Sequence, residues 1–139
     1  MIFLLKKASS LQEPWIQRKL PKKASNKGRA GEEAAACYLE KKGMQILQRN
    51  FRSRSGEVDI IALDGETVIF TEVKTWSAYG IEALEQSLDA KKQRKIIETS
   101  KYFLSLHREY KYMAIRFDVI FISPEGITHI ASAFTERIR

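Results

Sequence analysis

The stretch that decides the fold runs from residue 56 to residue 74 and reads GEVDIIALDGETVIFTEVK. Residues 58–63 and 67–73 are rich in branched side chains, which is typical of β-strands. Between them lies Asp64-Gly65, the strongest short signal for a hairpin. We therefore expect two antiparallel strands joined by a two-residue loop made of Asp64 and Gly65.

That loop sets the expected register of the hairpin. Leu63 then pairs with Glu66, and the same register places Asp59 opposite Phe70 and Glu57 opposite Glu72. Side chains alternate between the two faces of a strand, and both faces are apolar near the loop. The hairpin should therefore lie inside a sheet that is covered on both sides. One face carries Glu57, Asp59, Ile61, Leu63, Val68, Phe70, Glu72 and Lys74.

Three carboxylates and one lysine on that face suggest chemistry. In the expected register Asp59 and Glu72 are diagonal neighbours with Cα atoms about 7–8 Å apart. Glu57 lies beside them, and Lys74 points the same way as Glu72. Clustered carboxylates repel one another, and Mg²⁺ or Mn²⁺ would relieve that repulsion. The set suits metal-assisted phosphodiester hydrolysis, although a buried ion-pair network with Lys74 neutralising Glu72 is an alternative.

The flanking sequence predicts helices around this hairpin. Ser25-Asn26 and Gly43 are typical of the two ends of a helix over residues 27–42, with Glu32 at the edge of its apolar face. Helical spacing of apolar residues predicts a second helix over residues 88–110. Further strands are expected over residues 45–52, 116–122 and 127–130. The order α-β-β-β-α-β-β predicts an α/β protein, a central mixed β-sheet flanked by helices.

Charge divides the 139-residue chain into two parts. The chain has 24 Lys and Arg, 17 Asp and Glu, and a net charge of +7. Residues 1–31 hold eight basic residues and one acidic residue, so they carry the whole excess. We expect a basic, flexible N-terminal arm over residues 1–26 and a folded domain over residues 27–139. The arm suits contact with nucleic acid, and a solubilising tail is the alternative.

Composition also excludes several classes of protein. The single cysteine, Cys37, excludes an intramolecular disulfide and a Cys-rich zinc site within one chain. No apolar stretch approaches the 18 or so residues of a membrane span, and the order of charges at the start is unlike that of a signal peptide. A cytoplasmic protein with no membrane partner is expected.

At this point a resemblance to known families becomes apparent. Gly56-Glu57-Val58-Asp59 followed by Glu72-Val73-Lys74 resembles the D…ExK signature of restriction-endonuclease-like nucleases. An ordered set of further motifs resembles the bacterial YraN family of uncharacterised proteins over about residues 27–134. These motifs are Lys27-Gly28-Arg29-Ala30-Gly31-Glu32, Tyr38-Leu39, Gly43, Ile46-Leu47, Arg49-Asn50, Asp64-Gly65, Lys92-Gln93 and Arg116-Phe117-Asp118-Val119.

The resemblance implies a restriction-endonuclease-like core related to archaeal Holliday junction resolvases. It implies Asp59 and Glu72 as metal ligands, Lys74 as the catalytic lysine and Glu32 as a further acid at the metal. Glu57 is a candidate to complete the metal shell. The expected activity is a Mg²⁺- or Mn²⁺-dependent endonuclease on DNA, with branched and single-stranded DNA among the candidate substrates. A nuclease-like fold that binds nucleic acid without cutting it is the alternative, and an adaptor for an acidic protein is a third.

Several residues are candidates for contact with nucleic acid. Arg52 and Arg54 lead into the acidic strand, so they are well placed for phosphate. Trp76 stands where the YraN family usually has a basic residue, and it could stack on a base or pack in the core. Cutting both strands would call for a twofold dimer. The full set of candidates is Arg52, Arg54, Lys92, Trp76, Lys27 and Arg29.

Overall fold

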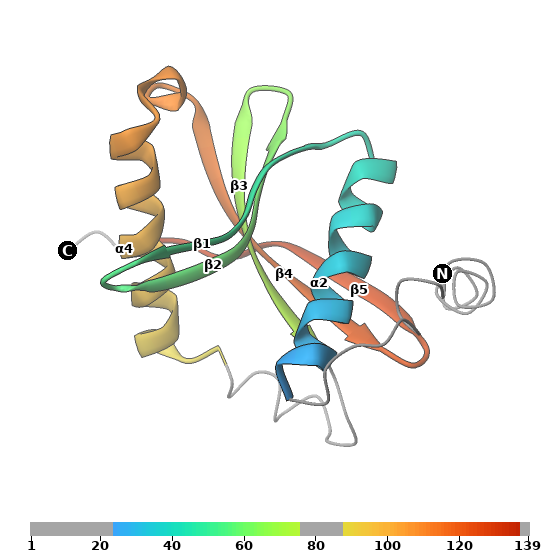
Figure 1. Cartoon of the computed structure of the whole chain (residues 1–139). Helices are drawn as coiled ribbons and strands as arrows, with labels where there is room; N and C mark the ends of the chain where they lie inside the picture. Colours follow the sequence, from blue (N-terminus) through green and yellow to red (C-terminus); the bar gives the residue numbers. More distant parts are fainter. Residues whose placement is uncertain (1–23, 76–87, 137–139) are drawn as a thin grey trace.

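The computed structural model describes residues 24–75 and 88–136 (Figure 1). The elements follow the predicted order α-β-β-β-α-β-β, with one added 3-10 turn. Within the described ranges, no helix is both long and apolar enough to cross a membrane. The elements are α2 (Ala24–Lys41), β1 (Gln45–Ser53), β2 (Gly56–Asp64), β3 (Thr67–Thr75), α4 (Ala90–Leu106), η1 (Arg108–Tyr110), β4 (Ala114–Ser123) and β5 (Gly126–Phe134).

The strands form one five-stranded sheet in the order β1-β2-β3-β4-β5. Neighbouring strands are antiparallel except β3 and β4, which are parallel. A parallel pair needs a long crossover connection, and α4 lies in that connection. The expected α/β fold with a central mixed sheet is therefore confirmed, and the β2–β3 hairpin lies inside the sheet as predicted.

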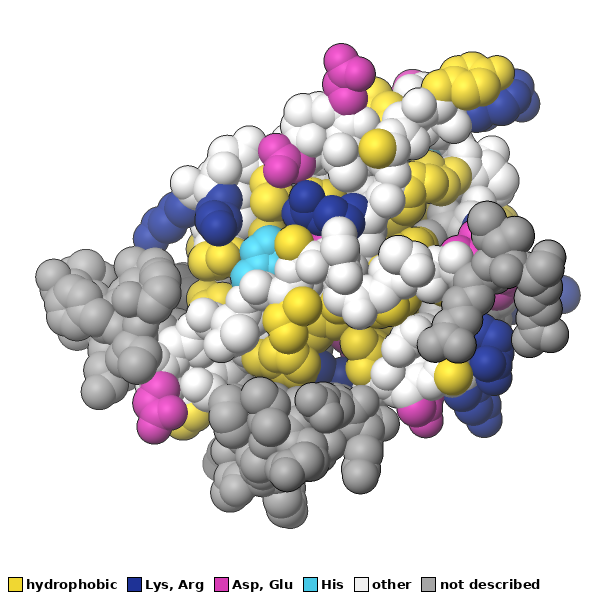
Figure 2. Space-filling model, turned by 180° about the vertical axis from the view of Figure 1, so that it is seen from behind, with side chains coloured by type: hydrophobic (Ala, Val, Ile, Leu, Met, Phe, Trp, Pro, Cys, Tyr) yellow, Lys and Arg dark blue, Asp and Glu magenta, His cyan; other side chains and the backbone are white. Residues whose placement is uncertain are grey.

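The two helices lie on opposite sides of the sheet (Figure 1). One core joins α4 to the sheet through Ile96 and Phe103, which pack with Ile61 and Phe70. The other core lies under α2, where Leu39 and three neighbouring alanines pack against Ile60, Ile69 and Ile120 of the sheet. From behind, hydrophobic side chains gather over the middle of the molecule, and a histidine lies there beside basic side chains (Figure 2). The hairpin is thus covered on both faces, as its composition predicts.

The hairpin register differs from the expected one by two residues. Asp64 pairs with Thr67, so the loop consists of Gly65 and Glu66 rather than Asp64 and Gly65. Gly65 has a φ of +63°, and glycine at the first loop position is the arrangement of a type II′ turn. A shift by an even number of residues leaves every side chain on its predicted face.

This correction changes which acidic residues are neighbours. Ile61, not Asp59, lies opposite Phe70, and Ile60 lies opposite Thr71. The next positions along the two strands are Asp59 and Glu72. The expected pairing of Glu57 with Glu72 is therefore wrong, and the two buried acids of the candidate site are brought closer together than expected.

The helix boundaries also differ in detail. α2 begins at Ala24, three residues before the predicted start, and the chain turns at Gly43 with a φ of +93°, as expected. Asp89 caps α4, because its Oδ1 accepts a hydrogen bond from the Lys92 N–H at 2.9 Å. The predicted helix over residues 88–110 is in fact two pieces, since α4 ends at Leu106 and the chain continues into η1.

Candidate active site

The predicted acidic residues line one cleft beside the central strands. The cleft measures about 840 Å³ and lies where the last residues of β3 meet the first turns of α2 and α4. All the predicted metal ligands and the predicted catalytic lysine border it, together with basic residues of α4. The charged residues that line it are Glu32, Arg52, Glu57, Asp59, Glu72, Lys74, Lys92 and Lys95.

α2 approaches the cleft closely because of one glycine. A Cβ atom placed on Gly31 would lie 2.5 Å from the Thr75 side-chain oxygen at the end of β3. A larger residue there would force the helix or Thr75 to shift. The close approach holds the neighbouring Glu32 at the wall of the cleft.

Asp59 is a buried carboxylate in an unfavourable electrostatic setting. Its side chain accepts a hydrogen bond from the Val73 N–H at 2.8 Å, and the residue is 8% exposed. Burial, followed by repulsion from Glu72, raises the pKa of Asp59 to about 8, and Glu32 adds to the shift. Among the described residues no Lys, Arg or His lies within ion-pair distance of Asp59. A cation in the cleft would stabilise its charged form.

Glu72 differs from Asp59 because two lysines face it. Its Oε2 lies 3.3 Å from Lys74 Nζ and 3.4 Å from Lys92 Nζ. Glu72 is 5% exposed, so these cations compensate a carboxylate that is almost wholly removed from water. The ion pair between Lys74 and Glu72, which the sequence left as an alternative, is therefore present. It leaves the charge of Asp59 unbalanced.

Glu32 and Glu57 border the cleft in two further environments. Burial raises the pKa of Glu32, whereas a hydrogen bond from the Asn50 side chain opposes that shift. Asn50 has a φ of +52°, a left-handed conformation that asparagine tolerates better than most residues. Glu57 faces Arg52, whose Nε lies 3.6 Å from Glu57 Oε1 in a partly exposed pair. No local sequence pattern indicates the contact between Asn50 and Glu32.

The donor set fits a magnesium ion held mainly by water. Across residues 24–75 and 88–136, no group of three or more His, Cys, Asp or Glu side chains is arranged to hold a metal ion. Mg²⁺ in enzymes commonly binds to one or two carboxylates and keeps several waters. Asp59 and Glu72, the two most buried carboxylates of the cleft, supply the two carboxylates that such a magnesium site needs.

Comparison with known proteins places the chain in a family. The model of the uncharacterised protein family UPF0102 matches residues 31–122. The chain belongs to UPF0102. This match confirms the resemblance to the YraN family, which is the same family. The matched region includes every acidic residue of the cleft and both lysines that face Glu72.

Relatives from several organisms cover most of the chain. A UPF0102 protein of Persephonella marina is 47% identical over 108 residues, which is 78% of this chain and 92% of the relative. One from Alcanivorax borkumensis is 40% identical over 101 residues, 73% of this chain and 81% of the relative. One from Treponema pallidum (strain Nichols) is 37% identical over 126 residues, 86% of this chain and all of the relative. Their names state the family and no activity.

The residues predicted to contact nucleic acid are only partly gathered at the UPF0102 cleft. Arg52 and Lys92 line it, whereas Arg54 borders a neighbouring groove. Arg29 is exposed on α2 and does not line the cleft. The Lys27 side chain, Trp76 and residues 1–23 of the predicted arm lie outside the described residues. Lys95 of α4 also lines the cleft.

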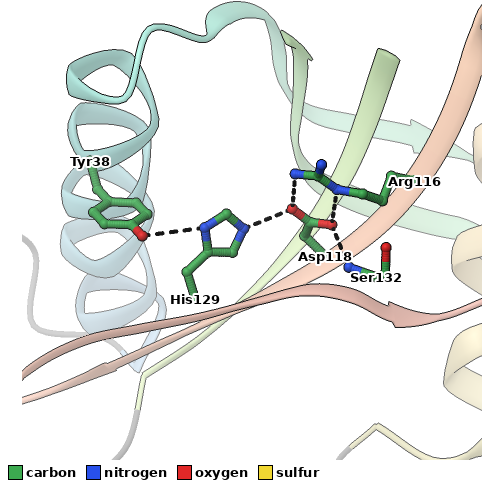
Figure 3. A network of polar contacts seen from close by, with 5 residues as sticks. All are labelled: Tyr38, Arg116, Asp118, His129 and Ser132. Carbon is green, nitrogen blue, oxygen red and sulfur yellow. Dashed lines mark hydrogen bonds and ion pairs between the residues drawn. The ribbon is translucent and has the colours of Figure 1, made fainter.

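A second buried aspartate lies away from the cleft and is fully paired (Figure 3). Arg116 donates to both oxygens of Asp118, from Nε at 2.8 Å and from a terminal nitrogen at 2.9 Å. His129 Nε2 lies 2.7 Å from Asp118 Oδ2, and the Ser132 N–H donates to Oδ1 at 3.0 Å. On the other side of the ring, His129 Nδ1 lies 3.3 Å from the Tyr38 hydroxyl. The network ties β4 and β5 to α2, which agrees with a structural role for Asp118.

Proposed function

We propose that this UPF0102 protein is a metal-dependent endonuclease that hydrolyses phosphodiester bonds in DNA. The observation that carries the proposal is Asp59, a buried carboxylate with a raised pKa and no cation partner among the described residues, next to Glu72. Ionising a buried carboxylate that has no cation partner costs stability, and such sites are often functional. A divalent cation supplies the missing charge, and a phosphodiester brings further oxygen ligands.

Mg²⁺ or Mn²⁺ would be held by Asp59 and Glu72, with Glu32 and Glu57 completing its shell through water. The ion supplies Lewis-acid polarisation of the phosphate and a bound water of lowered pKa. Glu32 suits a role through water, because it borders the same cleft and its pKa is raised by burial and by Glu57 and Glu72.

Lys74 has a role that needs its proximity to Glu72. Its Nζ lies 3.3 Å from Glu72 Oε2, and its side chain is 24% exposed, so the ammonium group faces the cleft rather than bulk solvent. From there it can orient the attacking water or stabilise the charge that develops on the phosphate. Lys92 reaches the same oxygen from α4, so with Glu72 bound to the ion it would be placed to contact a neighbouring phosphate.

The decisive experiment is a cleavage assay on labelled DNA. Duplex, single-stranded and four-way-junction DNA are incubated with Mg²⁺, Mn²⁺ or EDTA. We expect metal-dependent cutting that falls at least about 100-fold in Lys74→Ala, because one positioned acid–base or electrostatic group contributes roughly that much. Lys111→Ala is the matched control, since Lys111 is an exposed lysine whose Nζ lies over the Tyr112 ring, outside the cleft.

The same assay distinguishes the alternative function. Binding of DNA without cutting in either metal, unchanged by Lys74→Ala, would identify a nucleic-acid-binding protein on this fold and would exclude the nuclease. Circular dichroism and thermal unfolding of each variant show whether a loss of activity reflects a loss of structure.

A further inference from the structure

We propose that the groove beside the candidate active site binds single-stranded DNA, with one unpaired base stacked on Tyr102. This inference rests on the proposed nuclease function and names the form of DNA that the site receives. The groove measures about 580 Å³, and Arg52 and Ser53 line both it and the active-site cleft. A strand can therefore pass from one to the other without leaving the protein surface.

Tyr102 offers an aromatic surface in this groove. The residue is 48% exposed, although it lies on α4 next to the buried Phe103. Its ring contacts Phe51, which is 7% exposed, with a centroid separation of 5.9 Å and an interplanar angle of 32°. The buried ring supports the exposed one and limits its movement. Base stacking on such a ring tolerates any sequence, because every base has a π face.

The charges of the groove suit a phosphate backbone. Arg52, Arg54 and Lys101 border it, against one acid, Glu98. Lys101 is already paired with Glu136 at 2.6 Å and with Glu98 at 3.6 Å, so the two arginines are the cations that a phosphate would meet. Arg54 has no ion-pair partner among the described residues, and the pair of Arg52 with Glu57 is long and partly exposed. Exposed pairs of this kind contribute little, so a phosphate can compete for the guanidinium group.

The combination of a ring and cations favours a single strand over a duplex. In a duplex the base faces are covered by neighbouring bases, so Tyr102 could not stack without unpairing one. An unpaired strand exposes both its bases and its phosphates at the spacing of neighbouring nucleotides.

The test measures binding without catalysis. Fluorescein-labelled oligodeoxythymidine and a duplex of equal length are titrated with the full chain in EDTA. We expect Tyr102→Ala to weaken single-strand binding about 10-fold and to leave duplex binding unchanged, because one stacked base contributes roughly that much. Tyr102→Phe should bind as the wild type does. Tyr112→Ala removes a tyrosine that is 91% exposed and borders neither cavity, so it should have no effect.

Failure of this inference is distinguishable from failure of the nuclease proposal. Equal loss for single strand and duplex, an equal effect of Tyr112→Ala, or no effect of Tyr102→Ala would each overturn the stacking site. If the wild type still cuts DNA in Mg²⁺, the nuclease survives that result. Conversely, a Tyr102-dependent single-strand affinity with no cutting in either metal would overturn the nuclease and retain the stacking site.

Discussion

Two buried aspartates in the same sheet have opposite electrostatic environments. Asp59 on β2 faces other carboxylates, and burial together with Glu72 raises its pKa to about 8. Burial would also raise the pKa of Asp118 on β4, but hydrogen bonds from His129, Arg116 and the Ser132 N–H lower it to about 2. One carboxylate is therefore difficult to ionise, whereas the other is held in its ionised form.

The difference separates a structural acid from an acid suited to chemistry. Asp118 has its partners supplied by the fold, from Arg116 two residues before it and from β5. It has little left to offer a ligand. Asp59 receives one backbone hydrogen bond. None of the described residues supplies a cation that would stabilise its ionised form. We infer that the fold is stabilised at Asp118 and destabilised at Asp59.

The largest effect is expected for Asp59→Asn. Cleavage should fall about 1000-fold, equivalent to about 4 kcal/mol of transition-state stabilisation, because a metal ligand is lost. The free energy of unfolding at pH 7 should rise by about 1 kcal/mol or more, since the neutral amide removes a carboxylate that is repelled by its neighbours. Cleavage rates and urea unfolding measure the two quantities. Asp64→Asn, an exposed change on the same strand, should alter neither.

Asp118→Asn should have the reverse effect. The amide keeps one acceptor oxygen but removes the charge and puts an NH₂ donor against Arg116 or His129, and breaking a buried pair of this kind costs about 3 kcal/mol. For a chain of this size that lowers the midpoint of thermal unfolding by roughly 10 °C. Cleavage by the protein that remains folded should match the wild type. Normal stability with lost cleavage would place Asp118 in the active site and remove the contrast with Asp59.

The two aspartates should also give opposite dependences of stability on pH in EDTA. The folded pKa of Asp118 is about 2, below its ordinary 3.8, so its stabilisation is present above pH 4 and is lost as the pH falls toward 2. This lowering of the Asp118 pKa corresponds to about 2 kcal/mol in the free energy of unfolding. The folded pKa of Asp59 is about 8, above 3.8, so its contribution is complete below pH 4 and declines as the pH rises to 8.

Urea midpoints between pH 2 and pH 9 measure these slopes. Asp118→Asn should remove most of the loss of stability between pH 4 and pH 2. Asp59→Asn should remove most of the loss of stability between pH 4 and pH 8. If both variants retained the wild-type slopes, the assigned environments of the two carboxylates would be wrong.

Sequence reasoning predicted which side each charge faces better than it predicted the neighbours of each charge. Asp59, Glu72 and Lys74 line one cleft as predicted, because the alternation of side chains is preserved when a hairpin shifts by two residues. The register was wrong because loops at Asp64-Gly65 and at Gly65-Glu66 both satisfy the local turn preferences. Packing of the two strands in the sheet decides between them.

Contacts across long sequence separations were less predictable. Lys92 reaches Glu72 only because the connection between the parallel strands places the first turns of α4 beside the end of β3. His129 meets Tyr38 across 91 residues, and neither has a local pattern that indicates a partner. The sequence contained no sign that His129 belongs to the same network as Asp118.

The smallest effect is expected at the far end of that network, from Tyr38→Phe. His129 Nε2 lies 2.7 Å from Asp118 Oδ2, and His129 Nδ1 lies 3.3 Å from the Tyr38 hydroxyl. Losing this long, half-buried hydrogen bond should cost about 0.5 kcal/mol, while the edge-on contact of the two rings remains. Urea unfolding of Tyr38→Phe, alone and combined with Asp118→Asn, measures the coupling. A loss of unfolding free energy as large as that of Asp118→Asn would mean that Tyr38 is essential to the network. A small loss would show that the pair of Asp118 and Arg116 supplies most of the network's stabilisation.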